Sequence, residues 1–445
     1  MINNNHSNKI DEIDEIDKIE KIDEIDENNN KKDNLIENID KNNKNSYNFS
    51  NINITDNDYQ NIDIVEEGNV KIAFPCFDKV SSSAPVFYNP KMELNRDLSI
   101  LALQTFQKEI DREINICDLF GGSGIRGIRY KKEINSVGAI GINDISSNAM
   151  NWGKYNAQEN NVKVDFFQKE ANIFLRENRG LFDVIDIDPF GTPSFFLDSA
   201  CYTIKKDGML CVTATDTSAL CGTYKEPCIR KYNALPYKSE YCHETGIRIL
   251  AGFVALTLAK YKKYMEIKFA HSSEHYMRMY LKINKGSAAT DNSIKENIGH
   301  ITHCPKCLYR NTVKGLSSAI DITCPICGYK MKIAGPLWIG SIENKEFINK
   351  MLIELDNKQL NTKDEILKLL TTIYEESESP ITFYDIHKIS KNIKTNAPKQ
   401  DKVFEAIKDK GYTATKTHFN LLGIKTDVDI ESLKEIVIDI IKNES

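Results

Sequence analysis

The segment with the clearest chemistry in this chain is Asp188-Pro189-Phe190-Gly191, which follows the apolar run 182–187. A strand that ends in this way brings a carboxylate, a proline-fixed carbonyl and an aromatic ring to the edge of a sheet. The two oxygens can accept both N–H bonds of a planar amine, while the ring stacks on the group that carries it. The motif therefore predicts a site that handles an exocyclic amino group.

The chemistry that fits this motif is methyl transfer to the amine of a nucleobase, whose lone pair is delocalised into the ring. Hydrogen bonds to Asp188 and to the Pro189 or a neighbouring carbonyl would favour a more tetrahedral nitrogen, and Asp188 would take up the released proton. Phe190 is the predicted stacking surface for a flipped base. A helix cap or a turn is the structural alternative for Asp188, although three acids alternate here, at positions 183, 186 and 188.

A Gly-rich segment, residues 118–127, joins a predicted strand to a predicted helix. Its glycines let the backbone approach a ligand. Asp144 ends the next strand 20 residues beyond Gly124, where a carboxylate can receive the two hydroxyls of a ribose. Glu170, followed by Ala171, comes after the third strand and suits an adenine edge. The glycine spacing also fits NAD, but the Asp-Pro-Phe motif favours an S-adenosylmethionine-dependent N-methyltransferase.

Four of the eleven cysteines form two Cys-x-x-Cys pairs with 16 residues between them. These are Cys304, Cys307, Cys324 and Cys327. Thiolates at this spacing are typical of a closed tetrahedral zinc ribbon, so structural zinc is predicted, with a redox dithiol as the alternative. The other seven predict free thiols in a reducing, cytoplasmic compartment. Cys228 follows a proline, like a pyrimidine-methylating nucleophile, but lacks the surrounding motif.

The elements that position these residues alternate between strands and helices. Strands are expected at residues 114–120, 137–144, 162–167, 182–188 and 208–215. Helices between them predict an α/β fold, with the doubly wound parallel sheet of Rossmann-like class I methyltransferases. Two further runs, residues 265–270 and 276–283, predict an antiparallel hairpin at the sheet edge.

Composition divides the chain into four parts. Residues 1–56 carry 14 Asp/Glu against 7 Lys and predict a disordered acidic tail, which leaves the rest of a chain of net charge −6 near neutral. Residues 57–300 predict the methyltransferase domain, 301–335 the zinc ribbon, and 336–445 a smaller α+β domain, winged-helix-like from 380 to 426. No apolar run approaches the roughly 20 residues of a membrane span, and no obligate protein partner is implied.

Basic and aromatic residues are interleaved between Tyr224 and Tyr241. Such a stretch can contact phosphates and stack on bases, which predicts a nucleic-acid surface. A tyrosine-rich surface loop is an equally good interpretation of the same residues.

Together these motifs resemble the family of tRNA (guanine-26, N2)-dimethyltransferases. The resemblance spans roughly residues 64–440 and rests on segments 86–90, 95–97, 124–129, 143–146, 186–193, 215–222, 304–327 and 335–338. It implies S-adenosylmethionine as cofactor, tRNA as partner, and transfer of one or two methyl groups to N2 of guanine 26. It also implies that the C-terminal domain grips the tRNA.

The resemblance also implies a role for individual residues. Asp188 would be the catalytic carboxylate, with Pro189 beside it, and Phe87 and Phe190 would flank the guanine. The residues implied to bind S-adenosylmethionine are Arg96, Arg126, Asp144, Glu170 and Ala171. The nearest enzyme alternative methylates adenine N6 or another guanine. The alternative from a different class is a non-catalytic zinc-ribbon RNA-binding protein.

Overall fold

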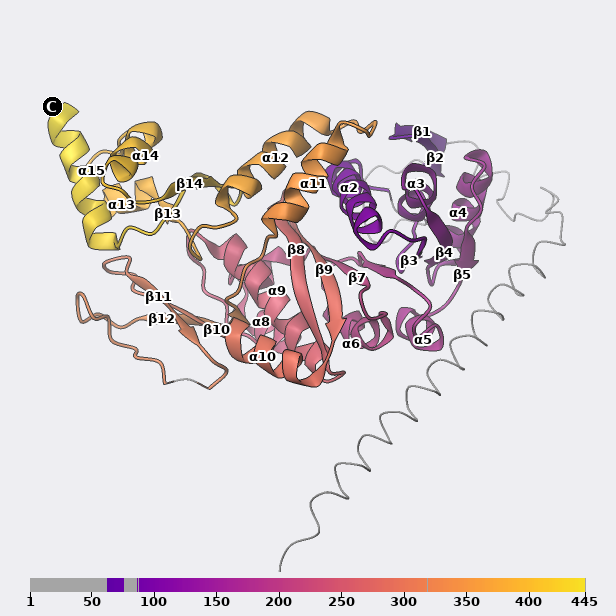
Figure 1. Ribbon diagram of the computed structural model, residues 1–445, viewed down its shortest axis with the longest axis horizontal. Coiled ribbons are helices and arrows are strands. Elements are labelled where there is room, and N and C mark those ends of the chain that lie inside the picture. Colours follow the sequence, from indigo (N-terminus) through magenta and orange to yellow (C-terminus); the bar gives the residue numbers. More distant parts are fainter. Residues whose placement is uncertain (1–61, 76–85, 87, 318, 445) are drawn as a thin grey trace, which may run out of the picture.

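The computed structural model describes residues 62–75, 86, 88–317 and 319–444. The predicted acidic tail, residues 1–56, lies outside the described residues, and so does Phe87. The described chain is built around one mixed sheet, with smaller sheets and a helical end attached to it (Figure 1).

The central sheet has seven strands in the order β5-β4-β3-β6-β7-β9-β8. Five are parallel: β3 (Ile114–Asp118), β4 (Val137–Asn143), β5 (Asp165–Phe167), β6 (Val184–Ile187) and β7 (Met209–Ala214). The hairpin of β8 (Lys263–Ser273) and β9 (Tyr276–Lys285) adds antiparallel to β7. The predicted parallel sheet with an antiparallel edge hairpin is therefore confirmed. The order reverses between β3 and β6, which is where ligands bind in open α/β sheets.

Helices cover both faces of the sheet, as Figure 1 shows. One face packs against α2 (Glu93–Ile110), α3 (Ile125–Glu133), α4 (Ser147–Glu159) and α11 (Lys345–Leu355). The other face packs against α5 (Ala171–Glu177), α6 (Ser194–Thr203) and α9 (Cys242–Ala259). All four residues of β6 are buried; three of them are apolar, as expected for a central parallel strand, and the fourth is Asp186. Helix α12 (Lys363–Glu376) lies beside α11 and α2.

Shorter elements complete this part of the chain. Strands β1 (Ile62–Glu67) and β2 (Val70–Pro75) form an antiparallel pair that packs near α3 and α4. After β7 come α7 (Thr217–Leu220) and α8 (Lys225–Tyr232), and α10 (Ser287–Asn297) follows the hairpin. Among the described residues α9 alone is long and apolar enough to cross a membrane, but 72% of it is buried inside the protein, as expected for a core helix.

The cysteine-rich insert is a three-stranded antiparallel sheet in the order β11-β10-β12. Its strands are β10 (Ile298–His303), β11 (Arg310–Lys314) and β12 (Lys332–Trp338). Strand β12 lies against α9 so closely that a Cβ on Gly252 would stand 3.0 Å from the Leu337 Cα. Ile301 and Leu337 are part of the main core. The insert thus shares its apolar core with the seven-stranded sheet, while its cysteine end has a small cluster of its own.

The C-terminal unit combines three helices with a small antiparallel sheet, β13-β15-β14, as the α+β expectation required. Its elements are β13 (Tyr384–Asp385), α13 (Ile386–Asn392), α14 (Gln400–Asp409), β14 (Ala414–Thr417), β15 (Asn420–Thr426) and α15 (Ile430–Glu444). A separate apolar cluster holds this unit together. In Figure 1 this unit forms the orange-to-yellow end of the molecule, next to the strands of the cysteine-rich insert.

Candidate active site

The Asp-Pro-Phe motif lies directly after β6, at the carboxyl edge of the parallel strands. The Asp188 carboxylate accepts a hydrogen bond from Arg126, which α3 contributes, and the two side chains form an ion pair. The Asp188 side chain is 20% exposed, whereas that of Arg126 is 6% exposed. Helix α6 begins at Ser194 with Pro193 at its cap position, so Asp188 is not the cap of that helix. The partly exposed Asp188 carboxylate is therefore held by a buried arginine.

Beneath Asp188 lies a buried charge network centred on Asp186, which shares its face of the sheet. Arg278 of β9 donates two hydrogen bonds to Asp186, at 2.6 and 3.0 Å, and Tyr130 of α3 donates another. Arg126 Nη1 lies 3.6 Å from the same carboxylate. Burial disfavours the charged acid, but Arg278 and Arg126 outweigh it and lower the pKa of Asp186. These ion pairs and hydrogen bonds hold the buried side chains below Asp188 in one arrangement.

Arg126 is held by polar groups of α2 as well as by the two acids. It donates to Asn95 Oδ1 at 3.0 Å and to Ser99 Oγ at 3.1 Å. Asn95 is fully buried, and its Nδ2 has no partner in the described part of the chain. A buried donor without a partner beside Asp188 is what a polar ligand would satisfy.

Hydrogen bonds to the end of β7 hold the rest of the motif in place. Gly191 N donates to Thr215 Oγ1 at 2.8 Å, and Thr215 N donates to Gly191 O at 2.9 Å. Gly191 has a φ of +78°, a conformation that favours glycine. Pro189 is buried, whereas Phe190 is 53% exposed. The ring is therefore presented at the surface by an anchored backbone.

The Gly-rich segment forms a cradle between β3 and α3. Gly122 N donates to Asp144 Oδ2 at 2.9 Å, which fixes the carboxylate at the end of β4 against the loop. Gly124 has a φ of +79°, and a Cβ there would stand 3.1 Å from Gly153 Cα. The Ser123 hydroxyl is buried without a partner among the described residues. The loop and the predicted ribose acid are thus in direct contact.

Asp118 ends β3 and pairs in register with Asp186. It accepts a hydrogen bond from Gly127 N at 2.9 Å. Burial, together with the nearby Asp186 charge, raises the pKa of Asp118 to about 7. This acid therefore braces the start of α3 and faces no solvent.

Glu170 and Ala171 lie at the start of α5, next to the end of β5. Glu170 Oε2 accepts from Ile173 N at 3.0 Å, so the side chain caps the helix. Its Oε1 accepts from Asn172 at 3.1 Å, and Ala171 is buried. The structure brings Glu170 to the same sheet edge as Asp144, while its local contacts are those of a cap. Its cofactor role stays a prediction.

Arg96 is built into a buried ion pair with Glu67 of β1. Its Nε and Nη2 donate to the two carboxylate oxygens at 2.5 Å each, and Nη2 also donates to Asn89 O at 3.2 Å. The guanidinium lies 5.2 Å from the centre of the Tyr88 ring. Arg96 therefore fixes β1 to α2 close to the segment that carries Phe87. Its contact with a cofactor is not tested by these bonds.

The four ribbon cysteines lie together, with all four sulfurs within 4.8 Å of one another. The Sγ atoms of Cys304 and Cys327 are 3.5 Å apart, as are those of Cys307 and Cys324. Thiolates about 2.3 Å from one zinc ion lie about 3.8 Å apart in a tetrahedron. Both loops turn alike, with Leu308 and Gly328 at φ of +69° and +67°. The donor set fits one tetrahedral ion.

The interleaved basic and aromatic stretch is only partly a surface. Tyr224 is 61% exposed, but Tyr232 and Tyr241 are buried. The Tyr232 hydroxyl donates to Asp216 at 2.7 Å, and Tyr241 hydrogen bonds His303 at 3.1 Å. These two rings belong to the core, so the interpretation as a continuous nucleic-acid surface is too broad.

Cys228 is fully buried, and burial raises the pKa of its thiol to about 12. A thiol that holds its proton so tightly is a poor nucleophile. The structural interpretation of this cysteine is therefore the better one.

Sequence reasoning missed the groups that support Asp188 from other elements. Arg278 and Tyr130, which complete the Asp186 network, lie far from the motif in sequence. Arg278 stands out as a cation between Met277 and Met279 in an apolar strand, but the pattern does not identify its partner. Glu67, the partner of Arg96, lies in an acidic strand and gives no such signal.

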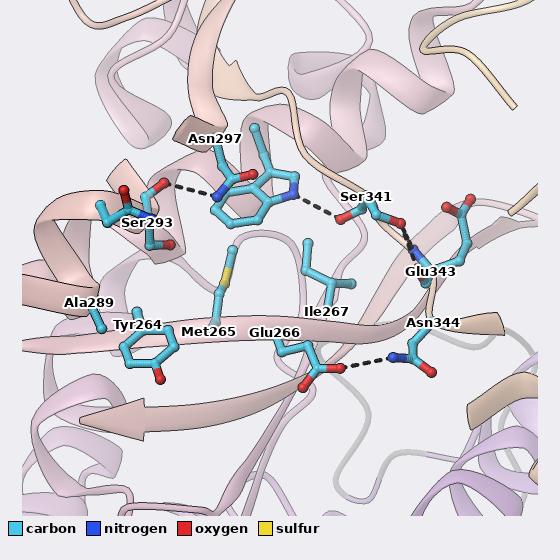
Figure 2. Close-up of a pocket in the computed structure, with 12 residues that line it drawn as sticks. Tyr264, Met265, Glu266, Ile267, Ala289, Ser293, Asn297, Ser341, Glu343 and Asn344 are labelled. Atoms are coloured by element: carbon cyan, nitrogen blue, oxygen red, sulfur yellow. Dashed lines mark hydrogen bonds between the residues drawn. The ribbon is translucent and has the colours of Figure 1, made fainter. Parts of the chain in front are cut away.

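A cavity of about 440 Å³ lies elsewhere, between β8, α10 and the segment before α11 (Figure 2). Asn344 donates to Glu266 at 2.9 Å along its wall, and the Trp338 indole donates to Ser341 O at 2.9 Å. No predicted site residue lines it. It is therefore separate from the candidate active site.

The sequence model of the family described as N2,N2-dimethylguanosine tRNA methyltransferase matches residues 61–438. A tRNA (guanine(26)-N(2))-dimethyltransferase from Methanobrevibacter smithii is 63% identical over 381 residues, covering 85% of this chain and 98% of the relative. A tRNA (guanine(26)-N(2)/guanine(27)-N(2))-dimethyltransferase from Aquifex aeolicus is 39% identical, covering 84% and 95%.

Among solved structures, the complex of Trm1 from Pyrococcus horikoshii with S-adenosyl-L-methionine is 33% identical, with a TM-score of 0.76. The match covers 84% of this chain and 99% of that one. The residues matched by the family model, 61–438, include the sheet, the ribbon and most of the C-terminal unit. This chain belongs to the N2,N2-dimethylguanosine tRNA methyltransferase family.

Proposed function

We propose that this protein transfers one or two methyl groups from S-adenosylmethionine to N2 of guanine 26 in tRNA. The observation that carries the proposal is Asp188 at the carboxyl edge of the sheet, ion-paired with Arg126 and followed by the exposed ring of Phe190. Membership of the family and the names of the relatives support the substrate. Guanine N2 is an exocyclic amine, which the motif is suited to receive.

The chain's own groups fit the proposed cofactor. S-adenosylmethionine, when bound, supplies an electrophilic methyl group on a sulfonium. Asp144, fixed against Gly122, is suited to the ribose hydroxyls, and Arg126 stands beside Asn95, whose Nδ2 has no partner among the described residues. Buried polar atoms without partners indicate space for a polar ligand. We assign cofactor binding to Arg96, Arg126, Asp144, Glu170 and Ala171.

Asp188 orients the amine and receives its proton. Its carboxylate and the Pro189 carbonyl are the proposed acceptors for the two N–H bonds, and Asp188 takes the proton lost when the nitrogen is alkylated. Phe190 and Phe87 are proposed to hold the guanine between them. The hydrogen bonds between Gly191 and Thr215 support this role, because they keep the backbone from moving when the base enters.

The four ribbon cysteines are proposed to hold one structural zinc ion. Four thiolates leave no open position, so the ion would contribute to folding and not to the chemical step. In zinc-finger peptides such binding is worth about 10–16 kcal/mol. The cysteine end of the ribbon has only a small cluster of buried residues of its own, which supports the same conclusion.

The C-terminal unit is proposed to grip the tRNA, and the protein is proposed to act in the cytoplasm. Helices α13 and α14 and the adjoining loops expose several lysines. These are Lys388, Lys391, Lys394, Lys399, Lys402, Lys408 and Lys410. Phosphate contacts by such side chains would add salt-dependent affinity without sequence specificity.

Mass spectrometry of nucleosides from unmodified tRNA after reaction tests the proposal. The expected products are N2-methylguanosine and N2,N2-dimethylguanosine at position 26, lost when guanine 26 is replaced by adenine. N6-methyladenosine, or methylated guanine at an unrelated position, would select the other amino-methyltransferase interpretation. If calorimetry detects no S-adenosylmethionine binding, the protein is a non-catalytic RNA-binding scaffold instead.

A further inference from the structure

Outside the proposed site, two cysteines and a histidine meet where α7 ends and α9 begins. Cys221 follows the last residue of α7, and Cys242 and His243 open α9. One ligand atom of each, the two sulfurs and a ring nitrogen, lie within 4.8 Å of one another. The proposed methyl transfer uses none of them.

The two sulfurs differ in their surroundings. Cys242 is partly exposed at the N-terminal end of an 18-residue helix, whereas Cys221 is buried. A hydrogen bond from the Cys221 thiol, the N–H groups of Cys242 and His243, and the Lys238 charge lower the pKa of Cys242 although burial opposes them. The same hydrogen bond, with burial, raises the pKa of Cys221. Of the two, the more accessible Cys242 therefore loses its proton more readily than the buried Cys221.

The other described cysteines outside the ribbon lack this combination. Cys117, Cys201, Cys211 and Cys228 are fully buried, and burial raises the pKa of each. Among the described cysteines outside the ribbon, Cys242 therefore combines partial exposure with a second sulfur beside it. His243, the third member of the cluster, forms a hydrogen bond between its Nδ1 and Ser272 Oγ at 3.1 Å. The two sulfurs remain next to each other.

We propose that Cys242 and Cys221 form a redox-active dithiol that a peroxide converts to a disulfide. The Cys242 thiolate attacks one peroxide oxygen, the O–O bond breaks, and Cys242 becomes a sulfenic acid as hydroxide leaves. The Cys221 sulfur then attacks the sulfenic sulfur, the S–S bond forms and the S–O bond breaks. The protons of the two thiols leave in water, so two thiols and one hydrogen peroxide give one disulfide and two waters.

The position of the pair links it to the Asp-Pro-Phe motif. Helix α7 follows Thr215, which binds Gly191, and it packs tightly on α9, where a Cβ on Gly246 would stand 3.2 Å from Leu220 Cβ. A disulfide would tie the end of α7 to the start of α9. The inference itself concerns the covalent chemistry and stands whether or not the proposed substrate is correct.

The test uses the full-length, zinc-loaded protein with hydrogen peroxide in small molar excess, then iodoacetamide, then trypsin without reduction. Cleavage after Lys225 and Lys238 separates the two cysteines, so peptides 207–225 and 239–248 remain joined only through a disulfide. We expect the joined peptides, with fragment ions that place the bond on Cys221 and not on Cys211. We also expect the peroxide-treated protein to have two fewer thiols that react with iodoacetamide than the untreated protein.

Variants assign the order of events. In Cys221→Ser, a 1,3-dione probe should capture sulfenic acid on Cys242, and in Cys242→Ser neither product should form. Cys228→Ser is the matched control, because this buried neighbour should leave the bond intact. Alkylation of Cys242 no faster than of buried Cys201 in the wild-type protein, or absence of the joined peptides, would overturn the proposal. So would a second zinc ion per chain that Cys242→Ser removes, since the cluster would then be a metal site.

Discussion

Replacing Asp188 by Asn removes the carboxylate charge while it keeps the size of the side chain. The proposed mechanism makes this carboxylate the proton acceptor, and an amide cannot take up that proton. General-base catalysis contributes about 10²–10⁴ to a rate, which corresponds to about 3–5 kcal/mol in the barrier. We therefore expect the rate of methyl transfer to fall by about that factor.

Cofactor binding should change little in the same variant. Arg126 keeps its hydrogen bonds to Asn95, at 3.0 Å, and Ser99, at 3.1 Å, and its place 3.6 Å from Asp186. Removing the Asp188 charge takes one anion from the buried Arg126 guanidinium, but the Asp186 carboxylate stays beside it to compensate the cation. The dissociation constant for S-adenosylmethionine should stay close to that of the wild-type protein.

Single-turnover transfer of a labelled methyl group measures the rate, and calorimetry measures cofactor binding. Asp183→Asn is the matched control, because Asp183 precedes the same strand at its far end and binds Arg112 at 2.8 Å and Asn115 N at 2.9 Å. That change should lower the free energy of unfolding by about 1–3 kcal/mol and leave the transfer rate intact. A folded Asp188→Asn variant with a rate within about threefold of the wild type would refute the role of Asp188 as the base.

Three further outcomes can be checked by unfolding experiments. A chelator that strips zinc should destabilise the cysteine end of the ribbon and open it to proteolysis; an unchanged melting curve with zinc demonstrably removed would contradict this. Because the pKa of Asp118 is raised to about 7 in the folded protein and is about 3.9 in an unfolded chain, stability should fall as pH rises from about 4 to 7. Asp118→Asn should flatten that slope in thermal melts, and an identical slope would refute the assignment. Arg278→Met should cost about 3–5 kcal/mol in denaturant unfolding, and much of it should return when Asp186→Asn is added; simple additivity would show that the two groups are not coupled.

The sheet was predictable because its strands are apolar on both faces and bounded by glycine or polar residues. Helix α3, residues 125–133, starts after Gly124 as the sequence indicated, since that residue adopts a left-handed conformation that glycine favours. The hairpin of β8 and β9 was also found, but its strands reach Ser273 and Tyr276 and leave a shorter turn than expected. The alternation of apolar and polar residues therefore predicts the ends of such strands only roughly.

The candidate site was predictable where one element carries it and not where several elements meet. Asp188 and Asp144 follow single strands, so their common edge follows from the topology of the parallel sheet. The Arg96 pair with Glu67 and the Arg278 pair with Asp186 join residues 29 and 92 positions apart. Local patterns carry no information on such contacts, because any buried acid requires some cation and the sequence offers many.

Helix α9 shows why an apolar segment can hold several parts of the protein to one sheet. Its charged residues lie near its start: Glu244 accepts from Thr382 N at 2.9 Å and lies 3.4 Å from Lys425, while Arg248 donates to Gly340 O at 2.8 Å. Burial disfavours the charged acid, but Lys425 and Arg248 outweigh it and lower the pKa of Glu244. The remaining turns bury apolar side chains against the hairpin and the ribbon strands. The apolar turns of the helix thus supply buried surface for packing. The charged side chains of Glu244 and Arg248, at its N-terminal end, fix where the ribbon and the C-terminal unit attach.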